Sequence, residues 1–224
     1  MFPVLDNGGK SDFFFLEIED NEAIPQLIVD LCKKRLPAHY GVNPVNDIQV
    51  LCPMNRSENG AVNLNAVLQN ALNPSTVAIR RGGTEYRLGD KVMQIKNNYS
   101  KNTFNGDIGR IVGVDLEERT ISVVFDGEPM EYDVSALDEL VLSYAVTIHK
   151  SQGSEYPVVV IPFTMQFFVM LQRNLLYTGI TRAKKALILV GSKEAVGHAV
   201  RNSEVAKRNT GLVRRLVDIF GSRR

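Results

Sequence analysis

The chain has 224 residues, 44% of them hydrophobic and 23% charged, and its formal net charge is +1. This ordinary globular composition fits one large domain or two small ones and excludes wholesale disorder, a collagen-like repeat and a disulfide-rich scaffold. No apolar run approaches the roughly 20 residues of a membrane span, and the first residues lack the basic and apolar regions of a secretory signal, so we expect no membrane association.

The first 75 residues read as strand, helix, strand, helix. The β-prone run 13–18 is followed by Asn21, a candidate helix cap, and by apolar residues at helical spacing that stop at Pro37. The apolar run 48–52 predicts a short buried strand. A second helical pattern follows it and stops at Pro74.

The two cysteines, Cys32 and Cys52, lie within these apolar segments and form no CxxC pair. Cysteines in such surroundings are usually buried thiols rather than reactive groups. Unpaired buried thiols favour a reducing compartment, and we therefore expect a cytoplasmic protein.

Residues 76–139 have a different character, because short β-prone pieces alternate there with turn signals. Asp126-Gly127 lies between two such pieces and is a strong hairpin signal. The pairs Gly82-Gly83, Gly89-Asp90 and Gly106-Asp107 mark further turns. This segment predicts a small antiparallel barrel.

After residue 140 the α/β pattern returns. The wholly apolar runs 158–161 and 187–190 suit strands that are covered on both faces, as in a parallel sheet. Residues 166–177 between them can form a helix. The simplest fold is an α/β domain with a parallel sheet that is interrupted by an antiparallel β-barrel.

Charge is segregated along the chain. Residues 80–101 hold six bases and two acids, residues 115–139 hold one base and nine acids, and residues 182–224 hold eleven bases and three acids. This asymmetry permits a basic groove beside an acidic face. Ordinary solvated faces are the simpler interpretation of the charge counts alone.

A P-loop is not present in its usual form. Gly8-Gly9-Lys10-Ser11 resembles the end of GxxxxGK[ST], but Val4 occupies the position of the first glycine. A P-loop also follows a strand and opens a helix, whereas a β-prone run follows Ser11. If the protein handles a nucleotide, it lacks the usual triphosphate cradle.

The nine-residue string TIHKSQGSE (147–155) is a dense polar cluster between a β-prone lead-in and a buried strand. Polar groups at such a junction are costly unless they are paired or used. Thr147 and His149 can donate to phosphates or sugars, Lys150 adds a mobile cation, and Gly153 permits close approach of a backbone to a phosphate. A polar loop with a satisfied histidine is the alternative.

Two arginines lie next to predicted buried strands. Arg182 follows a helical pattern and precedes the run 187–190, and Arg56 follows the run 48–52. Ligands of open α/β sheets bind at a sheet edge, and a guanidinium fork suits a transferring phosphoryl group. A surface cation near a helix C-terminus and a loop arginine are the simpler alternatives.

Residues 94–107 interleave amides, two lysines and two aromatic residues without helical period. Grooves that bind single-stranded nucleic acid use this mixture, because amides and cations contact phosphate and sugar while aromatic rings stack on bases. A polar hairpin loop is the alternative.

Four long segments occur in the order of a known family. The segment VLCPMNRSENGAVNLNAVLQNALNP resembles motif IV, GDKVMQIKNNYSKNTFNGDIGRIVGVD the motif IVa region, SYAVTIHKSQGSEYPVVVIP motif V and LLYTGITRAKKALILVG motif VI of RecD-like/TraA-like superfamily 1B DNA helicases, the group of exodeoxyribonuclease V alpha subunits. The similarity covers roughly residues 13–191. The joint occurrence of four motifs makes coincidence implausible.

The resemblance implies a P-loop NTPase fold without the P-loop. A RecA-like domain 2A would comprise residues 1–75 and 140–224, and residues 76–139 would hold the motif IVa strand and an SH3-like 2B barrel. In this family the P-loop and the acid that binds Mg²⁺ belong to domain 1A, which this sequence lacks. The chain therefore looks like a fragment that does not hydrolyse ATP alone, and we expect no metal ligands in it.

The resemblance also implies residue roles. Arg182 would be an arginine finger on the γ-phosphate of Mg²⁺-bound ATP, and Arg56 a second arginine that converges on the same phosphate. Gly153 would face the γ-phosphate and Glu155 the ribose, with Gln152 in the same nucleotide-binding set. A single-stranded DNA track would be lined by Thr147, His149, Lys150, Gln94, Asn97, Asn98, Tyr99, Lys101 and Asn105.

The implied function is one half of an ATP-dependent 5′-to-3′ single-strand DNA translocase or helicase, in which ATP draws domains 1A and 2A together and hydrolysis releases them. Its partners would be single-stranded DNA, domain 1A of the same protein and, as in some family members, other subunits of a helicase–nuclease complex. Two alternatives stay open: a non-catalytic nucleic-acid-binding module, and a subunit that a P-loop partner completes in trans.

Overall fold

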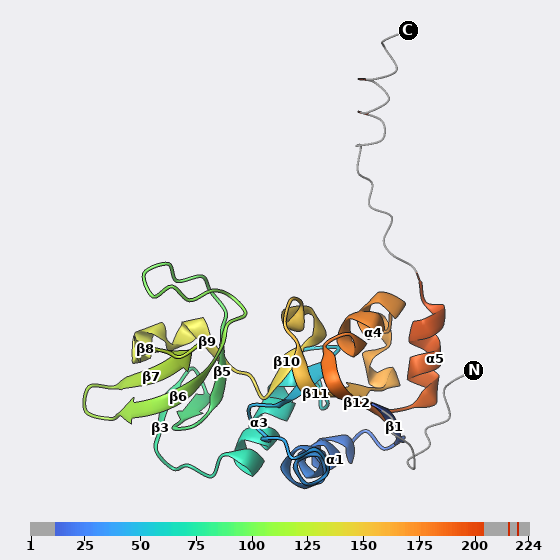
Figure 1. Cartoon of the computed structure of the whole chain (residues 1–224), viewed down its shortest axis with the longest axis horizontal. Helices are drawn as coiled ribbons and strands as arrows, with labels where there is room; N and C mark the ends of the chain where they lie inside the picture. The colour runs from blue at the N-terminus through green and yellow to red at the C-terminus, as the bar shows by residue number, and fades with distance from the viewer. Residues whose placement is uncertain (1–11, 204–214, 216–218, 220–224) are drawn as a thin grey trace.

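The computed structural model describes residues 12–203, 215 and 219 (Figure 1). The P-loop-like string 8–11 lies outside them. A five-stranded parallel sheet forms the α/β part, in the spatial order β1-β12-β11-β2-β10. The strands are β1 Phe13–Glu17, β2 Ile48–Cys52, β10 Ala145–Thr147, β11 Tyr156–Phe163 and β12 Ala183–Gly191.

Helices cover both faces of this sheet, which is why its central strands are apolar throughout (Figure 1). One face packs against α1 (Ile24–Asp30), η1 (Leu31–Arg35), α2 (Leu36–Tyr40) and α3 (Ala61–Leu72). The other packs against η3 (Ile148–Ser151), η4 (Met165–Met170), α4 (Arg173–Ile180) and α5 (Lys193–Arg201). No helix in the described part of the chain is long and apolar enough to cross a membrane.

The antiparallel sheet lies beyond the β10 side of the parallel sheet (Figure 1) and has the order β8-β7-β6-β5-β9. Its strands are β5 Lys91–Gln94, β6 Ile108–Asp115, β7 Thr120–Phe125, β8 Glu128–Asp133 and β9 Leu140–Leu142, with a hairpin of β3 Ala78–Arg81 and β4 Thr84–Arg87 and a 3₁₀ helix η2 Val134–Glu139 beside it. Its own core is built around Ile121, Val123 and Tyr132. The predicted fold class, a parallel α/β domain with a small antiparallel insertion, is confirmed.

The Asp126-Gly127 hairpin joins β7 to β8, as the sequence indicates. Both residues have positive φ, 47° and 90°, which is the geometry of a type I′ turn. Strand β9 lies outside the predicted segment 76–139 and pairs with β5. The division of the chain into domains stays a prediction.

Two local predictions are wrong. Pro37 does not end the first helix, which continues to Tyr40, because a π-helical turn precedes it: the N–H of Leu36 donates to Leu31 O, five residues back. The wider turn accommodates a residue without an N–H. Asn21 is not a side-chain cap among the described residues, since its carbonyl, not its side chain, accepts from Ile24 N.

The helix predicted over 166–177 is two separate pieces. The 3₁₀ helix η4 stops where Leu171 leaves helical geometry, and α4 begins at Arg173. Phe167 and Leu171 are fully buried in the core beneath these pieces. Burying both apolar side chains against the sheet therefore takes precedence over a continuous helix.

Candidate functional site

The parallel register defines two opposite edges of the α/β sheet. Tyr156 at the start of β11 aligns with Ala183 of β12, and Thr147 at the end of β10 aligns with Cys52 at the end of β2. An eight-residue strand such as β11 spans about 26 Å at ~3.3 Å per residue. We call the side before Tyr156 and Ala183 the amino edge and the side after Thr147 and Cys52 the carboxyl edge.

The segment 147–155 runs from the carboxyl edge to the amino edge. At its start Thr147 Oγ1 accepts from Lys150 N at 3.3 Å, and the buried Ser151 Oγ donates to Ile148 O at 2.8 Å. These bonds hold η3 as a compact turn. The remaining predicted ligand-binding side chains of the segment are exposed: His149, Lys150, Gln152 and Glu155.

The backbone turn in this segment explains why position 153 is a glycine. Gln152 has φ −60° and ψ 131°, Gly153 has φ +87°, and Ser154 N donates to Ser151 O at 3.1 Å. Together these values describe a type II turn, whose third position favours glycine. The space around the missing Cβ is open, so the backbone at Gly153 is accessible to a ligand.

Arg182 lies at the amino edge, between α4 and β12. Its guanidinium donates from Nη1 to Ser154 O at 3.0 Å and from Nε to Thr178 O at 3.2 Å, and Nη2 contacts Thr181 Oγ1 at 3.1 Å. Glu155 stands nearby in an ion pair with Lys184, at 3.1 Å. The structure thus brings together the predicted nucleotide set Arg182, Gly153 and Glu155.

Arg56 is not part of that group. It follows β2 and is exposed at the carboxyl edge, where the neighbouring Asn59 donates to Gln166 Oε1, a residue that follows β11. The length of the parallel strands separates Arg56 from Arg182. The expectation that both guanidinium groups converge on one phosphate is therefore wrong for this domain, because parallel strands carry the two residues to opposite edges.

The loop after β5 separates the predicted DNA-contacting residues into two classes. Gln94 is fully buried and donates to Glu139 Oε2 while accepting from Tyr132 OH, so it supports the loop and cannot contact DNA in this conformation. Asn98 also donates to Glu139, and these two bonds lower the pKa of that carboxyl group. Lys101 donates to Glu131 O and lies 3.7 Å from the centre of the Tyr132 ring.

The other predicted loop residues are accessible. Tyr99 is 79% exposed and meets the exposed Phe104 edge to face, with 6.2 Å between ring centroids. Asn97 and Asn105 are exposed as well, and Asn97 Oδ1 accepts from Asn105 N at 2.9 Å. The tip of the loop therefore presents an aromatic pair flanked by amides.

Sequence reasoning missed two buried charged residues at the joint between the sheets. The carboxylate of Asp90 is fully buried and accepts from Gln69, Asn73, Tyr144 and the backbone N of Arg87, at 2.6–2.8 Å. Lys91 follows it at 6% exposure. The sequence offered only a turn signal here, because a charged pair after glycine usually marks an exposed turn.

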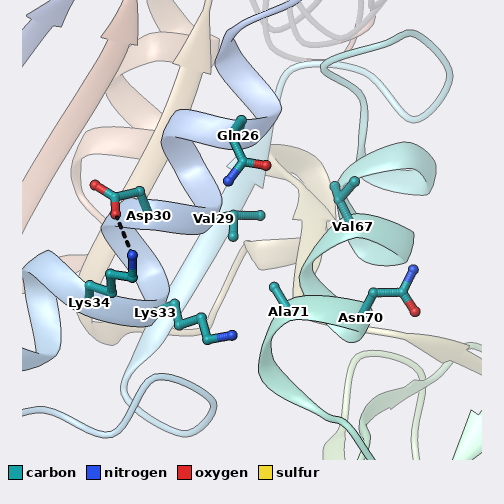
Figure 2. A pocket seen from close by; sticks show the side chains of 8 residues that line it. All are labelled: Gln26, Val29, Asp30, Lys33, Lys34, Val67, Asn70 and Ala71. Atoms are coloured by element: carbon teal, nitrogen blue, oxygen red, sulfur yellow. Dashed lines mark ion pairs between the residues drawn. The ribbon is translucent and has the colours of Figure 1, made fainter.

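A surface groove of about 380 Å³ lies between α1–η1 and α3 (Figure 2). Its rim includes Lys34, which pairs with Asp30 at 3.8 Å. The lining consists of Gln26, Val29, Asp30, Lys33, Lys34, Val67, Asn70 and Ala71. None of the predicted site residues belongs to this groove.

Comparison with known proteins decides the family. A model of the SH3 domain of ATP-dependent RecD-like DNA helicases matches residues 64–125, and a model of the UvrD-like helicase C-terminal domain matches residues 142–190. The ATP-dependent RecD2 DNA helicase of Deinococcus radiodurans is 38% identical over 169 residues, 75% of this chain and 23% of that protein. This chain belongs to the RecD-like helicase family.

Other relatives agree with that placement. The RecBCD enzyme subunit RecD of Haemophilus influenzae is 29% identical to this RecD-like chain over 175 residues, which is 78% of the chain and 26% of the relative. The chain spans about a quarter of the length of these curated relatives. A crystal structure of Pif1 helicase from Bacteroides with ADP-AlF3 and ssDNA has the same fold, with a TM-score of 0.52 and 14% identity over 91% of this chain and 52% of that one.

Proposed function

We propose that this RecD-like chain is the C-terminal motor domain of an ATP-dependent 5′-to-3′ single-strand DNA translocase or helicase. The observation that carries the proposal is the course of segment 147–155. It begins at the carboxyl edge with exposed polar side chains and ends at the amino edge, where Ser154 O accepts from Arg182. One short piece of backbone would therefore join the edge proposed for DNA to the edge proposed for the nucleotide.

Arg182 is the proposed arginine finger. A guanidinium has five N–H donors, and three interactions to Ser154, Thr178 and Thr181 leave part of this set for phosphate oxygens. Gln152, Gly153 and Glu155 would complete this side of the nucleotide site. A P-loop and its acid, supplied by domain 1A in cis or by a partner in trans, would hold ATP and Mg²⁺, and the chain alone would be inactive.

Single-stranded DNA would run along the carboxyl edge and the loop after β5. His149, Lys150 and the Thr147 hydroxyl suit phosphate and sugar contacts, and the Tyr99–Phe104 pair suits base stacking. Arg56 lies on the same edge and fits this track better than the nucleotide site. Some relatives are named as subunits of the RecBCD enzyme, so we include further subunits among the proposed partners of the parent protein.

The test joins this chain to the P-loop region of a RecD-like relative and measures ATP turnover with single-stranded DNA. We expect Arg182→Ala to lower turnover by about 10³-fold or more, because an arginine finger stabilises charge in the transition state. Arg173→Ala is the matched control, since Arg173 also lies on the α4 side but donates to Val200 O. DNA affinity should change little in either variant.

Two results would contradict the proposal. If Arg182→Ala kept turnover within about tenfold of the unsubstituted protein, Arg182 would not be a finger, since such residues typically contribute 10³-fold or more. If the purified chain hydrolysed ATP alone, the dependence on a second domain would be wrong.

A further inference from the structure

Lys91 is a buried cation at the junction of the two sheets. It is the first residue of β5, yet its ammonium group reaches out of the antiparallel sheet into the α/β part. Nζ donates to Ile48 O, at the start of β2, over a long 3.4 Å, and lies 5.9 Å from the centre of the Tyr156 ring, at the start of β11. Among the described residues this is its one hydrogen bond to the protein.

The neighbouring Asp90 is held quite differently. Its carboxylate accepts four hydrogen bonds from α3, the β4 end and Tyr144, all of them short. Asp90 therefore fixes one point of the antiparallel sheet. Lys91, with a single long bond and a ring contact, is the part of the joint that can shift when β5 moves about that point.

Lys91 is connected to both ends of the proposed machinery, through β5 on one side and through Tyr156 on the other. Strand β5 leads directly into the loop that carries Tyr99, and Gln94 N at the end of β5 donates to Asp107 O across the base of that loop. On the other side, Tyr156 N donates to Arg182 O at 2.9 Å. A displacement of β5 would move Lys91, and through Lys91 it would reach the ring of Tyr156. From Tyr156 the displacement would pass to Arg182.

Stability alone gives no reason for a lysine at this position. Taking an ammonium out of water is costly, and replacing a buried ion by an apolar side chain of similar volume is often neutral or stabilising. A weakly bound charge between two sheets has a different use, since its interaction energy changes with small changes in distance.

We propose that Lys91 is a positioning residue that couples DNA on the loop after β5 to the position of Arg182. The inference rests on the proposed function. When single-stranded DNA engages the loop, β5 shifts about Asp90, and the ammonium group carries the shift to Tyr156 and the amino edge. Lys91 touches neither DNA nor nucleotide in this scheme.

Hydrogen exchange on this chain tests the coupling. The quantity is the ratio of exchange rates of Tyr156 N–H without and with a saturating thymidine oligonucleotide. We expect a change of about fivefold or more in the unsubstituted chain, the lower end of typical coupling between two sites. Lys91→Met should remove the change while oligonucleotide affinity stays within about twofold, because the loop itself is intact.

Lys185→Met is the matched control. Lys185 donates to Tyr40 O at 3.1 Å and lies 5.7 Å from the Tyr40 ring, so it makes the same kinds of contact from an exposed position on β12 and contacts α2 instead of joining the two sheets. This variant should keep the full change in exchange. If Lys91→Met also kept it, or Lys185→Met also lost it, the inference would be overturned.

A pH comparison needs no substitution. Burial lowers the pKa of Lys91 to about 8, so the change in exchange should shrink from about pH 7 to about pH 9 as the charge is lost. Two groups near Lys91 stay protonated over this range, because burial raises the pKa of Cys32 to about 12 and that of Tyr156 above its usual value. Asp47 also acts on Lys91 and favours its charged form. A pH-independent ratio would contradict the inference.

Failure of the chain to bind the oligonucleotide at all would instead contradict the proposed function.

Discussion

At the scale of single residues, the pKa of Lys91 depends strongly on the surroundings of its ammonium group. Burial holds the pKa of Lys91 near 8, below its usual value of 10.5, against the smaller opposing influence of Cys32 and Asp47. The unfolded chain therefore binds more protons than the folded one between these two values. Stability rises with pH wherever the unfolded state binds more protons, so the folded protein gains stability from about pH 8 to about pH 10.

Lys91→Met should remove this pH dependence. Because a shift of one pKa unit corresponds to ~1.4 kcal/mol, the free energy of unfolding of the unsubstituted chain should rise relative to the variant by on the order of 3 kcal/mol between about pH 7 and pH 10. Urea unfolding at several pH values measures both. Parallel pH profiles for the two proteins would show that Lys91 is not a desolvated cation.

At the scale of elements, the joint between α3 and the antiparallel sheet depends on Asp90. Two donors come from α3 and its end, Gln69 and Asn73, and a third is the hydroxyl of Tyr144, whose pKa is raised by burial and by the nearby carboxylate. Hydrogen bonds to a charged acceptor are stronger than those between neutral groups. We infer that Asp90 holds these elements together.

Asp90→Ala should destabilise the chain by about 3 kcal/mol or more, because it leaves several buried donors without an acceptor. Asp90→Asn should cost less, since its amide keeps one oxygen that can accept. Urea unfolding monitored separately in the two sheets gives the measurement. A loss below about 1 kcal/mol for Asp90→Ala would mean that water replaces the carboxylate.

The elements also show what a sequence can and cannot reveal. Apolar runs and the Asp126-Gly127 pair predicted β2, β11, β12 and the β7–β8 hairpin, because these signals are local. The prediction that the first helix ends at Pro37 was wrong, since the π turn that accommodates this proline depends on tertiary packing. Gln94 and Asp90 look like surface residues in a sequence, and only the contacts between distant segments make them buried supports.

For the candidate site, the sequence indicated which residues lie beside buried strands, but not at which edge of the sheet each of them lies. Arg182, Gly153 and Glu155 meet because they flank two adjacent strands at the same edge. Arg56 satisfies the same sequence argument, an arginine beside a buried strand, but lies on the far edge. The sequence showed proximity to a strand without showing which end of the sheet each residue occupies.

At the scale of the whole molecule, binding of single-stranded DNA should be weak and strongly dependent on salt. Each phosphate contact contributes about −0.7 to the slope of log K against log salt for single strands. Replacing Lys96, which is exposed on the loop after β5, together with Lys101 should lower affinity and flatten that slope. Fluorescence anisotropy with a labelled oligonucleotide at several salt concentrations measures both quantities.

Lys34→Ala is the control for this experiment, since Lys34 lies beside the groove of Figure 2 and pairs with Asp30. It should leave affinity and slope unchanged. Binding that is insensitive to salt, or equally weakened by Lys34→Ala, would show that the loop after β5 is not the DNA-contacting surface.

The backbone crosses between the two sheets twice, once after α3 and once before β10. Asn73 stands at the first crossing and Tyr144 at the second, and both donate to the same oxygen of Asp90. A unit tied at two crossings to one buried atom cannot swivel as it would on a single tether; it can only rock about that pivot. Flexible residues inserted at both crossings would therefore be needed to loosen the antiparallel unit from the α/β part, and they would not alter any proposed ligand-binding side chain.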